Sequence, residues 1–145
     1  MFIHSEIRKD NKTESRKVKN MLLNLTNHPS ANWQEEQKSE AIQRWGSVRD
    51  YPFPIVSAEW DEEEMLRYAD AIVSEVVELA PEAVLCQGEM NMTYILVVRL
   101  QQSGFPVYAA TSDRVTSEVL LPDGSVRKQS VFRFVMFRKY PEILS

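Results

Sequence analysis

The chain has 145 residues, of which 43% are hydrophobic and 26% are charged, and its formal net charge is −4 at pH 7. The length suits one compact domain, and this composition excludes a disordered, collagen-like or low-complexity chain. The acidic balance argues against binding to long nucleic acid, which usually needs a basic surface. No apolar run approaches the roughly 20 residues that span a bilayer, and no apolar signal core is evident, so we expect no membrane segment.

The sequence also lacks the usual motifs of metal and cofactor sites. The single cysteine, Cys86, excludes an internal disulfide and a cysteine-based metal site, and it is typical of a reducing, cytoplasmic location. His28 has no second histidine or cysteine at ligand spacing, so we expect no metal. Neither G-x-G-x-x-G nor G-x-x-x-x-G-K-[ST] occurs, and we therefore expect no dinucleotide or nucleoside-triphosphate cofactor.

Residues 1–20 differ in composition from the rest of the chain. They contain six basic and three acidic residues and few apolar residues that could join a core. We expect a mobile extension over residues 1–20 and a single domain over 21–145. An ordinary first helix is the other interpretation of this segment.

From Met21 onward the chain alternates between strand and helix patterns. Asn32, three residues before Glu35, matches a capping box and predicts a helix start, and Asp61 predicts a second one. The predicted order is a strand at 21–25, a helix at 32–45, a strand at 48–53, a helix at 61–80, a strand at 83–87, a helix at 90–102, a strand at 106–110, and two hairpin strands at 115–121 and 126–137.

This alternation predicts an α/β protein with a mostly parallel sheet covered by helices and an antiparallel hairpin at the end. The hairpin turn is predicted at Pro122-Asp123-Gly124. In an open parallel sheet, ligands bind outside the carboxyl ends of the strands, near the point where the strand order reverses. The rule selects three polar loops as candidates, at residues 26–28, 87–91 and 111–114.

Each candidate side chain in these loops has a second, purely structural interpretation. His28 is a general base or a histidine bonded to nearby backbone, and Arg114 is a phosphate clamp or a surface ion pair. Gly88 lets the backbone approach a ligand where a helix offers free amide groups. Glu89 is a catalytic carboxylate or a group that satisfies the helix start, and Thr93 lies one helical turn further on.

Charge is unevenly spread along the chain. Residues 59–82 contain nine acidic residues and one arginine, whereas residues 114–139 contain six basic and two acidic residues. A basic hairpin on an acidic protein suits a compact anionic ligand. It equally suits an acidic partner subunit.

Four segments together resemble the small CRISPR-associated ring nucleases of type III systems. They are Leu23–His28, Val84–Glu89 followed by Thr93-Tyr94, Pro106–Arg114, and Val131–Tyr140, and the resemblance covers roughly residues 21–140. It implies a Rossmann-like fold related to CRISPR-associated sensor domains that bind cyclic oligoadenylate. Members of such a family cut or capture cyclic tetra-adenylate, which switches off the antiviral effectors that this messenger activates. A symmetric ring would suit a twofold homodimer with both clefts facing it.

The resemblance further implies a metal-independent reaction in which a ribose 2′-hydroxyl attacks the adjacent phosphodiester. Arg114 would stabilise the developing charge, and His28 or Glu89 would accept the proton. The ligand-binding residues would be Thr26, Asn27, Gln87, Gly88, Thr93, Thr111 and Ser112. Two other functions remain open: a module that binds the messenger without cutting it, and a regulatory subunit that binds a protein partner.

Overall fold

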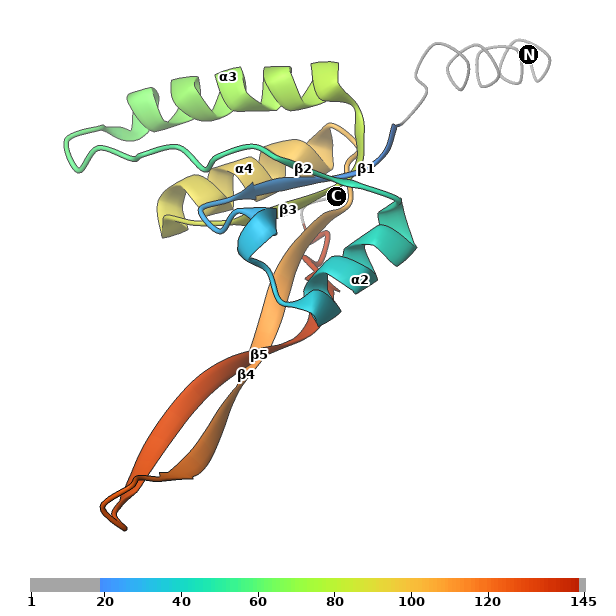
Figure 1. The fold of residues 1–145 in the computed structure, drawn as a ribbon. Coiled ribbons are helices and arrows are strands. Elements are labelled where there is room, and N and C mark those ends of the chain that lie inside the picture. The colour runs from blue at the N-terminus through green and yellow to red at the C-terminus, as the bar shows by residue number, and fades with distance from the viewer. Residues whose placement is uncertain (1–18, 144–145) are drawn as a thin grey trace, which may run out of the picture.

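A computed structural model describes residues 19–143 as a five-stranded sheet with helices on both faces (Figure 1). The order across the sheet is β2 (Val48–Asp50), β1 (Lys19–Thr26), β3 (Pro81–Gln87), β4 (Val107–Leu120) and β5 (Val126–Lys139). The first four strands are parallel, and β5 is antiparallel to β4. The predicted α/β class, mostly parallel sheet and C-terminal hairpin are thus confirmed. The proposed extension lies, up to residue 18, outside the described residues.

Two cores flank the sheet because successive strand residues point to opposite faces. Helix α2 (Glu35–Trp45) covers one face, and α3 (Glu62–Leu79) and α4 (Met90–Gln102) cover the other (Figure 1). The α2 side buries Leu22, Leu85 and Trp45, among others. The α3–α4 side buries a longer series of side chains: Leu23, Leu25, Val76, Val84, Cys86, Leu96 and Leu100. None of the helices described is long and apolar enough to cross a bilayer.

Local sequence signals correctly predicted the start of α3 and the hairpin turn. The Asp61 carboxylate accepts a hydrogen bond of 2.9 Å from the Glu64 amide, as expected of an N-cap. In the turn between β4 and β5, Gly124 has a φ of 85° and its amide donates to the Leu121 carbonyl. Few L-residues adopt this left-handed conformation, which explains the glycine.

The predicted capping box at the start of α2 is wrong. Asn32 ends a short 3₁₀ helix, η1 (Ser30–Asn32), and α2 begins only at Glu35. The cause is Trp33, which is buried in the core on the α2 side and whose indole N–H donates to the His28 carbonyl at 3.0 Å. Because this contact holds the chain extended at Trp33, the α-helix starts two residues later.

The predicted loop at residues 111–114 is also wrong, because β4 is one continuous strand that pairs with β5 from Tyr108 to Leu120. The switch from apolar to polar residues marks the place where the strand leaves the body of the protein and both its faces become exposed. A β-bulge at Val135 follows from the shifted register between Thr111 and Ser112. It turns both Phe134 and Phe137 into the α2-side core, although three positions separate them.

Candidate functional site

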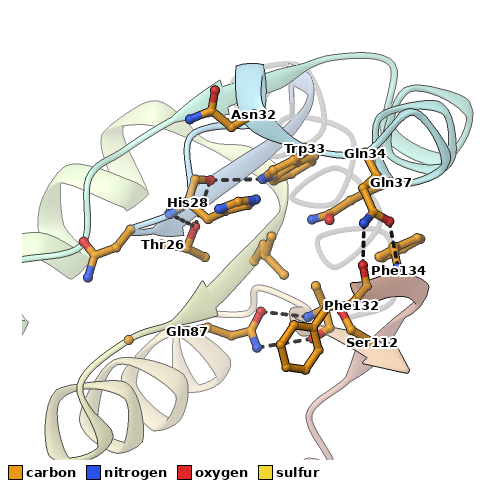
Figure 2. Close-up of a pocket in the computed structure, with 14 residues that line it drawn as sticks. Thr26, His28, Asn32, Trp33, Gln34, Gln37, Gln87, Ser112, Phe132 and Phe134 are labelled. Carbon is orange, nitrogen blue, oxygen red and sulfur yellow. Dashed lines mark hydrogen bonds between the residues drawn. The ribbon is translucent and has the colours of Figure 1, made fainter. Parts of the chain in front are cut away.

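A hollow of about 600 Å³ opens at the carboxyl ends of β1 and β3 (Figure 2). From β1 the chain continues through α2 to β2 on one side, whereas β3 lies on the other side of β1. The strand order therefore reverses between β1 and β3, which is where ligands bind in open parallel sheets. Fourteen residues line the hollow, and six of them are predicted site residues: Thr26, Asn27, His28, Gln87, Gly88 and Ser112.

The hollow combines neutral polar groups with aromatic rings. Asn32, Gln34 and Gln37 add amide groups to those of the predicted residues, and Trp33, Phe132 and Phe134 supply the aromatic walls. Among the fourteen lining residues, all within the described part of the chain, none carries a carboxylate, an ammonium or a guanidinium group. Such a lining suits the neutral hydrogen-bonding edges and flat faces of a heterocycle.

A hydrogen-bond network fixes the loop that carries His28. The Thr26 hydroxyl donates to Asn24 Oδ1 at 2.7 Å and accepts from the His28 amide at 3.1 Å. The Asn24 side-chain amide donates to the His28 carbonyl at 2.9 Å. With the backbone held in this way, the His28 imidazole points into the hollow (Figure 2).

The sequence analysis did not identify Asn24 and Asp50, whose side chains hold this loop in place through hydrogen bonds. Asn24 is buried, and its amide also donates to Asp50 Oδ1 at 2.9 Å. Asp50 in turn accepts from the Ser30 amide at 3.1 Å. Partial burial opposes ionisation of Asp50, but the hydrogen bonds from Asn24 and Ser30 outweigh it and lower its pKa below the ordinary value. The sequence does contain a signal for this role, because Asn24 is the one polar residue within the apolar run 21–25.

Gln87 and Gly88 connect the hollow to the sheet and to the α3–α4 core. The Gln87 side-chain oxygen accepts from the Ala110 amide at 2.9 Å, and its nitrogen donates to the Ala110 carbonyl at 3.3 Å. Gly88 borders the hollow, but a Cβ atom there would lie 2.5 Å from the ring of Phe53. Packing against Phe53 therefore requires the glycine whether or not a ligand binds.

The other four predicted residues lie outside the lining of this hollow. Glu89 caps α4 by accepting from the Met92 amide at 2.7 Å, and it borders a separate hollow of about 640 Å³ beside the start of α3. The Thr93 hydroxyl oxygen is buried and has no hydrogen-bond partner among residues 19–143. Thr111 donates to the Met136 carbonyl at 3.2 Å.

Arg114 lies near the hollow without lining it. Its side chain is exposed on β4, with the guanidinium carbon 6.0 Å from the centre of the Phe132 ring. Phe132 is a lining residue and is itself 65% exposed. The Phe132 ring therefore stands between Arg114 and the hollow.

Cys86 has the properties of a core residue. It is fully buried beneath α4, and burial raises the pKa of its thiol to about 12. Within residues 19–143, no three His, Cys, Asp or Glu side chains come together in a cluster that could hold a metal ion.

A family model matches most of the chain. Residues 20–138 match the model of a family described as the uncharacterized protein MJ1673 family. No curated protein and no solved structure matches the chain. The matched span includes α2, α3 and α4 and every residue that lines the hollow between β1 and β3. Because the match covers most of its length, the chain belongs to the MJ1673 family.

Proposed function

We propose that the protein is a Rossmann-like ring nuclease that binds cyclic oligoadenylate, specifically cyclic tetra-adenylate, in the hollow between β1 and β3. Cleavage of this messenger would switch off type III CRISPR signalling. The observation that carries the proposal is the hollow itself, which lies at the reversal of strand order and is lined by amides, hydroxyls and aromatic rings. The resemblance of four segments to small ring nucleases supports the same ligand.

The lining suits adenosine groups better than isolated phosphates. Asn27 offers a donor and an acceptor for base edges and ribose hydroxyls, and the exposed Phe132 ring offers a stacking surface for a base. Gln34 and Gln87 bond to strand backbone through one N–H and one lone pair each and retain a second of each for a ligand. Arg114, beside that ring, would meet a phosphate at the mouth. A hollow of about 600 Å³ holds a drug-sized ligand, which is smaller than a ring of four nucleotides. The rest of the ring would therefore contact groups supplied by the second copy of a homodimer.

The proposed reaction needs no metal and consumes no water. A ribose 2′-oxygen attacks the adjacent phosphorus, and the bond from phosphorus to the 5′-oxygen of the next nucleotide breaks. His28 accepts the 2′-hydroxyl proton, and a proton is returned to the 5′-oxygen, so the products carry a 2′,3′-cyclic phosphate and a 5′-hydroxyl. Arg114 stabilises the charge on the phosphorane, and Thr26, Asn27 and Ser112 hold the ring in line. His28 is favoured over Glu89 because only His28 lines the hollow.

Binding without cleavage is the second candidate function. It is favoured by the position of the catalytic candidates, because only His28 of the three lines the hollow, while Glu89 is engaged in capping α4. A sponge or sensor would use the same amides and aromatic rings and would need no proton acceptor.

Incubation of the protein with cyclic tetra-adenylate in EDTA, followed by chromatography, tests the proposal. Linear products ending in 2′,3′-cyclic phosphate are expected. His28→Ala and Arg114→Ala should each slow cleavage on the order of a hundredfold or more with the fold intact, and Arg127→Ala, near the hairpin turn, is the matched control. Ligand that stays intact but co-elutes with the protein would establish the binding module, and neither cleavage nor binding would overturn the proposal.

A further inference from the structure

The hairpin of β4 and β5 extends far beyond the other strands of the sheet, so the strands of its outer part pair only with each other. We call Ser112–Leu120 of β4 and Val126–Phe134 of β5 the arm (Figure 1). Both faces of the arm are largely exposed, including apolar side chains such as Val115 and Val131. A ribbon of only two strands is marginally stable in water, and three or more strands are needed for independent stability. The arm therefore has one strand fewer than a sheet needs to be stable by itself.

The two long edges of the arm differ in how they are protected. On β5, the Gln34 side chain occupies the outer edge near the body of the protein, because its amide donates to the Phe132 carbonyl at 2.6 Å and its oxygen accepts from the Phe134 amide at 2.9 Å. On β4, pairing with β3 ends at Tyr108, and Gln87 engages only Ala110. Within residues 19–143, the outer edge of β4 has no partner from Ser112 to Leu120, whereas that of β5 is free only from Val126 to Val131, so β4 has the longer open edge.

These contacts also show which residues of β4 direct their backbone groups outward. In an antiparallel ladder the N–H and C=O groups of one residue point to the same side, and this side alternates along the strand. Ala110 points outward because it bonds to Gln87. Phe132 points outward from β5, and its cross-strand neighbour Arg114 must then point outward from β4. The outward series on β4 therefore comprises Ser112, Arg114, Thr116, Glu118 and Leu120.

We propose that the β4 strands of two copies pair antiparallel about a twofold axis at Thr116, which joins the two arms into a four-stranded sheet. Only registers that place outward residues opposite outward residues form a ladder. In the register centred on Thr116, Arg114 of each copy faces Glu118 of the other. A register centred on Val115 or Ser117 places both charges opposite uncharged residues. Opposite charges directly across a strand pair stabilise it, so the Thr116 register is selected.

Within the arm, Glu118 lies across from Lys128 on β5, whereas Arg114 lies across from the uncharged Phe132. Neither Arg114 nor Glu118 forms an ion pair among the described residues. β5 is the poorer candidate for self-pairing because it contains five basic residues and no acidic one between Val126 and Lys139. Exposed ion pairs contribute little by themselves, so the new backbone ladder drives the association and the charges set its register.

The arrangement also bears on the candidate site, although it does not rest on the proposed function. In the Thr116 register, Leu120 of one copy lies opposite Ser112 of the other, and Ser112 lines the hollow. The turn of each arm therefore reaches toward the mouth of the other copy's hollow.

Cysteine cross-linking of the ligand-free protein tests the interface. Thr116→Cys should form a disulfide-linked dimer under mild oxidation, because residues opposed in a hydrogen-bonded pair lie about 5.5 Å apart between Cα atoms. Ser130→Cys is the matched control, since Ser130 is opposite Thr116 on β5 and equally exposed. Its two copies would be three strand spacings apart, about 14 Å, which is beyond disulfide reach. The buried Cys86 does not interfere.

Charge reversal provides an independent measurement. Glu118→Arg should weaken dimerisation on the order of tenfold by sedimentation equilibrium, and the swapped variant Arg114→Glu/Glu118→Arg should restore it. A wild-type protein that stays monomeric throughout the micromolar range would overturn the proposal. So would equal cross-linking of both cysteine variants, or a dimer in which Thr116→Cys forms no disulfide. Each of these outcomes is independent of whether cyclic oligoadenylate binds.

Discussion

Gly88 is a position in the candidate site that has no room for a larger side chain. A Cβ atom there would lie 2.5 Å from two ring carbons of Phe53, which is 3% exposed and cannot move into solvent. We predict that Gly88→Ala lowers the free energy of unfolding by about 1–3 kcal/mol, as overpacking of a dense core usually does. Chemical denaturation measures this effect.

A second substitution separates packing from any effect on ligand binding. Phe53→Leu should create space for the added methyl group, so Gly88→Ala should cost less in that background than in the wild type. If the two substitutions were simply additive, contact with Phe53 would not be the reason for the glycine.

At the scale of elements, Gln34 joins α2 to the hairpin. It precedes the first turn of α2, and its side chain forms two hydrogen bonds to the backbone of β5, at Phe132 and Phe134. We predict that Gln34→Ala costs about 1 kcal/mol of stability and speeds hydrogen exchange at the Phe134 amide, which loses its acceptor. Gln43→Ala, on the exposed face of α2, is the control. Unchanged exchange at Phe134 would contradict this role of Gln34.

At the scale of the whole molecule, the body and the arm are separable. Neither core contains a residue between Ala110 and Phe134. Replacing residues 116–130 by Asn-Gly, a two-residue hairpin turn between Val115 and Val131, should therefore leave the unfolding free energy of the monomer within about 1 kcal/mol of the wild type. The same variant should no longer dimerise. Denaturation at low protein concentration, compared with sedimentation at high concentration, measures both effects, and a large loss of monomer stability would contradict the prediction.

The sequence by itself determined the features that depend on neighbouring residues. The alternation of strand and helix patterns predicted the α/β class, Asp61 predicted the start of α3, and Pro122-Asp123-Gly124 predicted the hairpin turn. The general rule for parallel sheets also selected the two loops, at residues 26–28 and 87–91, that border the hollow. These predictions succeed because capping, turn geometry and hydrophobic periodicity act over a few residues.

Only the tertiary structure decided the features that join distant parts of the chain. Burial of Trp33 against the sheet moved the start of α2, and pairing with β5 kept β4 continuous through residues 111–114. Asn24, which donates to the His28 carbonyl, also donates to Asp50, 26 positions away. Glu89 follows β3, which borders the hollow, yet its carboxylate accepts from the Met92 amide and so caps α4. These features depend on contacts between segments that are distant in the sequence, and local sequence patterns do not encode such contacts.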